Sequence, residues 1–483
     1  MGDVESLDDF GVALLVASAG LALAIYGRVV ADRLALPTAA LLLVAAALLS
    51  DVFPDLGDVL SIEAVQWVTS AALIVILFDG GLHIGFRRFR QAAWPIAGLG
   101  LAGTFATAGL MTLAAHYLLG LSWTVSGLIG AAVAPTDPAV TFSVLGGKEI
   151  RGRSGTILEG ESGFNDPVGI ALMIGMVELA THDDGSLSIV LTEFLVEMAV
   201  GLAVGVGGGL LLVRLLRSVP LPEMALYPLR VLAFAGAVYG LAALAGGSGF
   251  LAVFVAGILL GDVTAPHKGE VERFFGTMAN LGEIAAFVVL GLTIDLTFIA
   301  EEGLWLDGLL LAVILAFLVR PLAVAPLLLP VRLTWGERGF VVWSGLKGAV
   351  PILLASLAVV GGTEYARELY AIVFVVVLFS VVVQGGAVPV AAARLRVPMR
   401  ARSRLGEASR HFVVGRDALA AGTRVAELPL AERAWVEAVY RDGRTLPLDG
   451  ETVLEPGDGV LVSLELEKLP TMQRIFEGRQ EPS

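Results

Sequence analysis

Apolar runs, each about long enough to cross a bilayer, follow one another along most of this chain. They lie near residues 10–27, 34–50, 62–80, 95–118, 123–146, 163–180, 188–216, 227–243, 247–262, 272–293, 305–330, 338–360 and 366–393. A spanning helix needs about 20 mainly apolar residues, so we expect about thirteen transmembrane helices. In lipid the backbone must satisfy its own hydrogen bonds, which favours an all-α polytopic membrane protein.

The composition supports this class and excludes others. Only 16% of the 483 residues are charged, and the mean hydropathy is +0.82. The chain has no cysteine, which excludes disulfides and thiolate metal sites. Its net charge of −14 argues against nucleic acid as a partner. Residues 1–5 lack the basic start of a signal peptide, so we expect the first run to be retained as a spanning helix.

The connections between the runs alternate in charge. One set is basic, with Arg28, Arg33, Arg87, Arg88, Arg90, Lys148, Arg151, Arg153, Arg214, Arg217, Arg230, Lys268, Arg273, Arg332 and Arg338. The other set is often acidic, with Asp51, Asp55, Asp58, Asp183, Asp184, Glu301 and Glu302. Basic loops stay in the cytoplasm, which predicts an external N-terminus and a cytoplasmic C-terminus in the cell membrane. An odd number of spans requires the same result.

The last part of the chain has a different composition. We expect a transmembrane domain over 1–397, a basic linker over 398–410 and a small α+β cytoplasmic domain over 411–483. Three short strands are predicted near 412–414, 435–439 and 459–462, and a helix over 469–476. Asp-Gly and Pro-Gly dipeptides between the strands predict the turns that join them. The arginines of the linker favour anchoring at the lipid surface.

The stretch 160–167, Gly-Glu-Ser-Gly-Phe-Asn-Asp-Pro, is predicted to open an apolar helix that runs to about Ala180. A carboxylate such as Asp166 is costly in lipid and usually faces a cavity on an ion or proton path. Ser162 lies four residues earlier, on the same helical face, and Asn165 is polar but carries no charge. A serine-hydrolase motif is excluded because Phe164 stands where that motif needs glycine.

Two apolar runs are interrupted by proline and polar residues. Ala134-Pro135-Thr136-Asp137-Pro138 cannot sit in a continuous helix, so the backbone must break around a cavity. Thr136 then offers its hydroxyl and a freed carbonyl to a cation, and Asp137 neutralises the N-terminal end of a half-helix. The second interruption, 344–351, carries Lys347. One broken span in each half of the chain is typical of an inverted-repeat transporter.

Two further charges lie within or beside apolar runs. Arg320 is too deep to stay unpaired, and Glu161 is our first candidate partner, with Asp137 the second. Asp79 is predicted to end the third span on the cytoplasmic side. There it either lines the ion entrance or reaches the water beside it.

These motifs together resemble the electroneutral NhaP-type branch of the monovalent cation:proton antiporters, which is related to the animal sodium/proton exchangers. The resemblance covers residues 10–395 and rests on Thr136-Asp137-Pro138, Gly163-Phe164-Asn165-Asp166-Pro167, Arg320 and Gly345-Leu346-Lys347-Gly348-Ala349-Val350-Pro351. It implies that Asp166 alternately holds a proton or a cation, with Ser162 and Thr136 as further ligands. Asn165 stands where electrogenic relatives have a second aspartate, which implies one-for-one exchange.

The resemblance also implies a homodimer in which a six-helix core moves against a dimerisation domain. Lys347 stands where the family commonly has arginine, and Asp79 stands where many sodium-selective members have glutamate. The Asp79 form is similar to a bacterial potassium/proton subgroup. The tail resembles the C-terminal half of potassium-conductance regulators, the TrkA-C domain, and such domains are often dimeric and can bind small nucleotides.

We therefore expect a secondary antiporter that exchanges K+ or Na+ for a proton, with no enzymatic activity and no cofactor besides the transported ions. An alternative is a channel gated by the cytoplasmic domain, although a carbonyl-ring filter motif such as Thr-Val-Gly-Tyr-Gly is missing from the sequence. A second alternative is an intramembrane aspartyl enzyme that uses Asp137 and Asp166. Proline breaks and a buried Arg320 fit that enzyme poorly.

Overall fold

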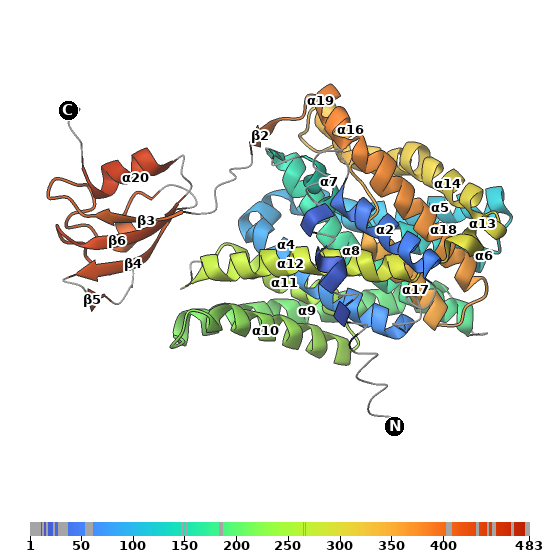
Figure 1. Ribbon diagram of the computed structural model, residues 1–483, viewed down its shortest axis with the longest axis horizontal. Coiled ribbons are helices and arrows are strands. Elements are labelled where there is room, and N and C mark those ends of the chain that lie inside the picture. Colours follow the sequence, from blue (N-terminus) through green and yellow to red (C-terminus); the bar gives the residue numbers. More distant parts are fainter. Residues whose placement is uncertain are drawn as a thin grey trace. The chain divides into compact units, whose positions relative to one another are not determined.

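The structure is a computed structural model (Figure 1). It describes residues 37–53, 61–145, 148–150, 152–182, 187–263, 265, 267–401, 408–430, 434–441, 444–446, 451–464 and 468–478, with scattered residues between 11 and 27. The first predicted span and part of the basic linker therefore lie outside the described residues. The chain divides into two compact units, Met1–Arg400 and Ala401–Ser483.

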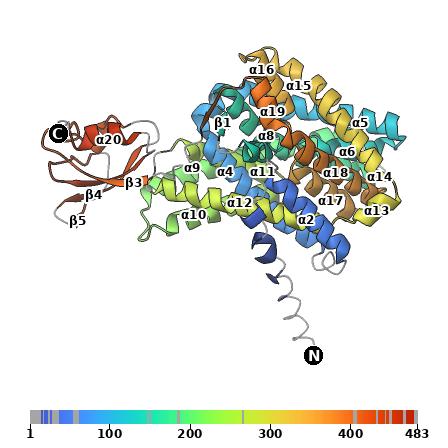
Figure 2. The ribbon, with the colours of Figure 1, turned by 45° about the horizontal axis from the view of Figure 1, so that its top comes forward.

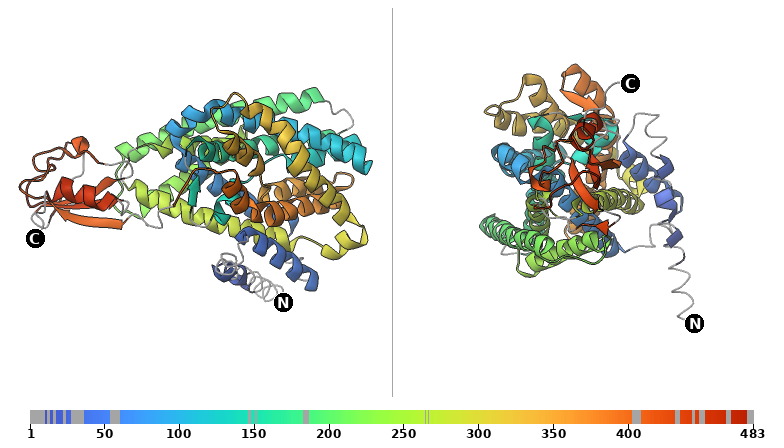
Figure 3. Two further views of the ribbon diagram at one scale, coloured as in Figure 1. Left: turned by 90° about the horizontal axis from the view of Figure 1, so that it is seen from above. Right: turned by 90° about the vertical axis from the view of Figure 1, so that its left-hand side faces the viewer.

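The first unit is helical. Its elements are α2 (Thr38–Val52), α4 (Ile62–Ala97), η1 (Gly98–Gly103), α5 (Thr104–Leu119), α6 (Trp123–Val133), α7 (Pro138–Val144), β1 (Lys148–Ile150), α8 (Arg153–Thr181), α9 (Leu187–Ser218), α10 (Leu226–Leu244), α11 (Gly249–Gly261), α12 (Lys268–Leu292), α13 (Leu296–Glu301), α14 (Leu304–Ile314), η2 (Leu315–Val319), α15 (Arg320–Leu328), α16 (Trp335–Trp343), α17 (Ala349–Val360), α18 (Ala366–Phe379), η3 (Ser380–Gly385), α19 (Val388–Arg394) and β2 (Met399–Ala401). Most of these helices run along a common direction and are seen end-on in the right-hand view of Figure 3.

Seven helical stretches of the described residues are long and apolar enough to cross a membrane. They are Ile62–Leu119, Arg153–Thr181, Val190–Ser218, Leu226–Leu244, Lys268–Leu292, Leu304–Leu328 and Ala366–Gly385. Shorter apolar helices lie at Thr38–Val52, Trp123–Val133, Gly249–Gly261 and Ala349–Val360. The polytopic helical class is confirmed, and the count of thirteen stays a prediction.

Two predicted spans meet within α4. Gly85 has φ 66° and ψ 162°, a conformation that only glycine adopts readily, so α4 breaks there. The Asp262 carboxylate lies against Gly85 and accepts a hydrogen bond from the Arg87 N–H, which caps the helix that follows. The helix therefore runs past Asp79 as far as this break, and where the third span leaves the membrane stays a prediction. The polar residues that follow Asp79 do not prevent helix formation, so the helix continues until Gly85 breaks it.

The start predicted for the helix around Asp166 is also wrong. α8 begins at Arg153, and Pro167 lies inside the helix rather than in its first turn. The early turns carry charged residues, which lower their hydropathy but do not prevent helix formation. The helix packs closely on both sides of the proline, because Gly163 and Gly169 lie against Phe254 and Pro135 with no room for a side chain.

Within the described residues, three π-helical segments interrupt the long helices. Two of them flank polar residues of the candidate site, since η2 ends immediately before Arg320 and η3 begins at Ser380. In the third, η1, the hydroxyls of Thr104 and Thr107 donate to the carbonyls of Gly100 and Gly103, each at 2.7 Å. π-helical turns are rare and often occur at functional sites, where they change the direction of a side chain.

The second unit is a small α+β fold. Its elements are β3 (Ala408–Val413), η4 (Val425–Glu427), β4 (Trp435–Arg441), β5 (Arg444–Thr445), β6 (Gly459–Leu464) and α20 (Leu469–Phe476). The strands form an antiparallel sheet in the order β3-β6-β4-β5, and α20 lies along one face (Figure 2). Alternate residues of β6, Val460 and Val462, point into the core with Phe412 and Phe476. The predicted strands and final helix are confirmed.

Candidate functional site

The two predicted breaks lie against each other. The first separates α6 from α7 over residues 134–137, and the second separates α16 from α17 over residues 344–348. The Asp137 N–H donates to the Leu346 carbonyl at 2.8 Å, which joins the two extended segments. Prolines 135 and 138 explain the first break, because each lacks the N–H that a continuous helix needs.

Lys347 lies at the open end of α6. Its Nζ donates to the carbonyls of Ala134 at 2.9 Å and Pro135 at 2.8 Å, and the residue is only 1% exposed. The last carbonyls of a helix have no partner within the helix and carry a partial negative charge. The ammonium group therefore satisfies the carbonyls that the first break releases.

Asp137 lies at the start of the opposite half-helix. Its carboxylate is so close to Gly348, the N-cap residue of α17, that a Cβ at Gly348 would overlap it. The N-terminal end of a helix carries a partial positive charge, which a carboxylate stabilises. Each break thus supplies a charge that compensates a helix end of the other break.

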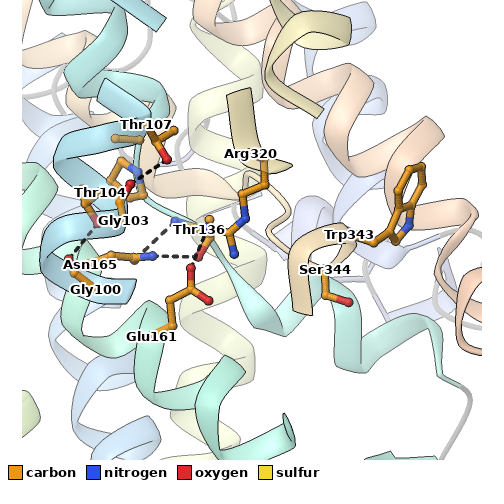
Figure 4. Close-up of polar contacts among 12 residues, drawn as sticks. Gly100, Gly103, Thr104, Thr107, Thr136, Glu161, Asn165, Arg320, Trp343 and Ser344 are labelled. Carbon is orange, nitrogen blue, oxygen red and sulfur yellow. Dashed lines mark hydrogen bonds and ion pairs between the residues drawn. The ribbon is translucent and has the colours of Figure 1, made fainter. Parts of the chain in front are cut away.

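Asn165 holds the first break to α8. Its Nδ2 donates to Thr136 Oγ1 at 2.7 Å, and its Oδ1 accepts from the Thr136 N–H at 3.3 Å (Figure 4). Both residues are buried, with 1% and 5% of their surface exposed. Both ends of the amide are therefore engaged with the peptide and hydroxyl of Thr136, so Asn165 acts as a clamp on the unwound segment.

Asp166 follows this clamp on α8. Its side chain is 4% exposed, and its Oδ1 makes no hydrogen bond within the part of the chain that the structure describes. It interacts electrostatically with Asp137 and Lys347. Ser162, one turn earlier, is also buried. A buried carboxylate oxygen without a donor is costly, and either a proton or a cation removes that cost.

Arg320 and Glu161 form a buried ion pair that interacts with Lys347. Arg320 Nη1 lies 2.6 Å from Glu161 Oε1, and the two side chains are 3% and 1% exposed (Figure 4). The structure confirms the first candidate partner. The guanidinium lies against Gly345, where a Cβ would overlap it, so this glycine of the second break makes room for the pair.

Asp79 contacts a histidine one turn away, a partner that the sequence does not predict. It lies on α4, where Oδ1 is 3.3 Å from Nδ1 of His83 and 17% of its side chain is exposed. The sequence predicts that it lines an ion entrance or reaches the adjacent water. Its partial exposure fits either alternative.

Ser380 and Gln384 support the second break and were not predicted. The Lys347 N–H donates to Ser380 Oγ at 2.8 Å, and Ser380 Oγ donates to Gln384 Oε1 at 3.2 Å. Gln384 Nε2 then donates to the Trp343 carbonyl at 2.7 Å. The signal that would have found them is a pair of polar residues four apart inside the apolar run 366–393.

The chain matches known proteins along most of its length. Residues 19–394 match the model of the sodium/hydrogen exchanger, transmembrane family. The chain is 30% identical to the K(+)/H(+) antiporter NhaP2 of Shewanella sp. strain ANA-3, over 99% of this chain and 85% of that protein. It is 33% identical to the K(+)/H(+) antiporter NhaP of Alkalimonas amylolytica, over 85% of this chain and 73% of that protein.

A solved structure shares the fold. The sodium proton antiporter MjNhaP1 of Methanocaldococcus jannaschii is 24% identical, with a TM-score of 0.68 over 79% of this chain and 99% of that one. Family model, full-length relatives and fold agree. The chain therefore belongs to the sodium/hydrogen exchanger family, in its NhaP-type branch.

Proposed function

We propose that this protein is a secondary antiporter that exchanges K+ or Na+ for a proton across the cell membrane, with Asp166 as the exchanged site. The observation that carries the proposal is a buried Asp166 carboxylate with an unbonded oxygen beside two crossing helix breaks. The relatives support the class, since those at 30% and 33% identity are named K(+)/H(+) antiporters.

The mechanism needs one carboxylate with two exclusive occupants. A proton or a partly dehydrated cation neutralises Asp166, and both cannot do so together. Ser162 and Thr136 offer oxygen ligands to the cation. K+ and Na+ are hard cations, and hard cations bind preferentially to oxygen ligands of this kind. Only a neutral, loaded site crosses the low-dielectric interior at low cost, so movement of the site exchanges one ion for the other.

The surrounding charges remain fixed in this mechanism. Lys347 and Asp137 compensate the half-helix ends, and Glu161 neutralises Arg320. Because Asn165 cannot ionise, one proton is exchanged for one cation and no net charge moves. Asp79 and the tail favour K+ as a substrate alongside Na+.

The remaining features of the proposal concern topology and assembly. The N-terminus lies outside and the C-terminus in the cytoplasm, following the distribution of basic loops. The protein works as a lipid-embedded homodimer, and residues 411–483 regulate transport as a TrkA-C-like domain with a small nucleotide as its ligand class. The basic linker over 398–410 joins that domain to the transmembrane part.

The test is ion exchange in liposomes. Purified protein with an imposed pH gradient is challenged in turn with K+, Na+ and Li+, and proton movement is followed with an internal pH dye. Asp166→Asn should abolish exchange, because the amide takes up neither a proton nor a cation in its place. Asp307→Asn, the same change on α14 away from the breaks, should keep it. Near wild-type exchange in Asp166→Asn would overturn the proposal.

Two further measurements test its finer parts. With the potential clamped by an ionophore, the exchange rate should not depend on voltage, and strong voltage dependence would rule out one-for-one exchange. Exchange driven by Na+ but not by saturating K+ would overturn the proposed K+ transport. Single-channel currents in a planar bilayer would favour the channel alternative, which the relatives do not support.

A further inference from the structure

An apolar cavity of about 870 Å3 opens among α5, α6, α8 and α9. It lies near the ends at which α5 meets α6 and α8 meets α9. Its lining is almost entirely hydrocarbon and aromatic, and includes Phe105, Gly109, Trp123, Met176, Leu191 and Phe194. The volume is in the range of ligand-binding pockets, roughly 300–1,000 Å3.

The cavity opens toward an exposed apolar surface of the helices. Its rim residues Leu113, Trp123 and Leu191 are 44%, 52% and 54% exposed, although all three are apolar or aromatic. The most apolar stretch within Val190–Ser218 is only 28% buried inside the protein. The rim therefore continues the lipid-facing surface of the helices into the cavity.

The physical properties of the cavity select its occupant. An apolar cavity gives water too few hydrogen-bond partners to hold it. Hydrated solutes are excluded for the same reason, and the bilayer supplies hydrocarbon at the rim. We propose that this cavity binds one acyl chain of a membrane phospholipid. The lining of an empty cavity lacks contact atoms on one side. Each CH2 group that enters supplies those contacts, so the gain in binding free energy is dispersion attraction to the lining.

Charges beside the rim favour a headgroup without net charge. Glu178 on α8 and Glu193 on α9 lie within hydrogen-bonding reach of each other, and both interact with Glu197. They are sequence neighbours of the lining residues Leu179 and Phe194. Two carboxyl groups at hydrogen-bonding distance share a proton and keep one negative charge, which disfavours an anionic headgroup, so we expect a zwitterionic phospholipid.

The floor of the cavity lies close to the helix segment that carries Asp166. Phe105 and Phe194 pack edge to face with their ring centroids 5.1 Å apart. Phe194 also packs against Val168 and Ala171 of α8, which follow Asp166 by two and five residues. A bound acyl chain is thus separated from that segment by one aromatic layer. The binding proposal itself does not depend on the proposed exchange activity.

The test uses the full-length protein in liposomes with phosphatidylethanolamine that carries a photoactivatable diazirine on one acyl chain. After illumination, labelled peptides are identified by mass spectrometry. We expect label to concentrate on the lining segments of α5, α8 and α9, at least fivefold above the exposed apolar face of α10. A diazirine-labelled phosphatidylglycerol at equal concentration should label these segments less.

Gly109→Leu provides the matched variant. A Cβ at Gly109 meets no atom within 4 Å, so leucine there fills the cavity without a clash at its root. Gly236→Leu makes the same change at an exposed position of α10 where a Cβ also meets no atom within 4 Å. Labelling of the lining should fall at least fivefold in Gly109→Leu and stay unchanged in Gly236→Leu.

Several outcomes would overturn the proposal. Label spread evenly over all lipid-facing peptides of the wild-type protein would do so even if Gly109→Leu failed to fold. Equal labelling in folded Gly109→Leu and wild type would do so as well. Protection of the lining from every lipid probe would overturn it too. Equal labelling by phosphatidylglycerol would overturn the headgroup preference.

Discussion

The buried Glu161–Arg320 pair makes a quantitative prediction about stability. In Glu161→Gln the side-chain shape is nearly kept, but the guanidinium 2.6 Å away loses its counter-charge. Both residues are almost fully buried, so water does not replace the lost partner. Lys347 belongs to the same charge cluster, and its repulsion of Arg320 then loses the compensation that Glu161 supplies.

The expected magnitude follows from the burial of both partners. Removing one member of a buried ion pair costs about 3–5 kcal/mol, because the other charge stays in a low-dielectric site. This corresponds to a roughly 10²- to 10⁴-fold change in the ratio of folded to unfolded protein. Replacing both members by residues of similar volume is often neutral or stabilising. The double variant Glu161→Gln/Arg320→Met should therefore be more stable than Glu161→Gln alone.

The assay is a double-mutant cycle measured by unfolding in mixed micelles with increasing dodecyl sulfate, followed by circular dichroism. The matched control is Asp295→Asn. Asp295 pairs with Arg367 at 2.9 Å, but the two side chains are 48% and 66% exposed, and asparagine can keep the N-cap bond to Phe298. Exposed pairs contribute about 0–1 kcal/mol, so the control should change little.

Two results would refute this reasoning. One is a loss in Glu161→Gln no larger than that of the exposed control, which would show that water or another group compensates Arg320. The other is additivity, in which the double variant loses the sum of the two single losses. A coupling energy of about 2 kcal/mol or more is the result that supports a buried pair.

Three other predictions concern the breaks and the tail. Gly348→Ala places a Cβ into the Asp137 carboxylate. Exchange should then fall steeply, and the free energy of unfolding should fall by about 1–3 kcal/mol. Unchanged transport in liposomes would contradict the contact between the two breaks. Asp458→Asn should weaken the second unit by about 1–3 kcal/mol, seen as faster amide exchange in β6, because Arg441 donates to both of its oxygens at 2.8 Å. Hydrogen bonds from Arg441 also lower the pKa of Asp458, so this stabilisation is present above the ordinary aspartate pKa of about 3.9 and is lost as the pH falls through the lowered value; protection that improved with acidification would contradict it. Truncation after Arg404 should keep exchange but shift its activation by pH or ligand, and complete loss in a truncated protein that still inserts would count against a regulatory tail.

Much of the site could be predicted because its residues violate local rules. Two prolines near Thr136 exclude a continuous helix, and an arginine in an apolar run requires a carboxylate partner. The first rule predicts the first break, and the second predicts a carboxylate partner for Arg320, with Glu161 the first of two candidates. The strands of the second unit could be predicted for a similar reason, since short β-rich runs alternate with glycine turns.

Other features depend on tertiary contacts that local rules do not describe. The start of α8 at Arg153 was hidden because charged residues there resemble a loop by hydropathy. Asn165 was predicted as an ion-site residue that carries no charge, and only the structure shows its two bonds to Thr136. The support of Lys347 by Ser380 comes from a residue 33 positions away, so no spacing rule indicates it.

The contact between Lys347 and the Ala134 carbonyl has a consequence for biogenesis. The two residues are 213 positions apart, so the first break is synthesised long before its counter-charge exists. At roughly 5–20 residues per second, the ribosome needs about 10–40 s to add the intervening chain. Free carbonyls in lipid cost several kcal/mol each, so α6 and α7 must wait near water or the insertion machinery. Final burial of the first half is therefore a post-insertion step that begins only after the second half arrives.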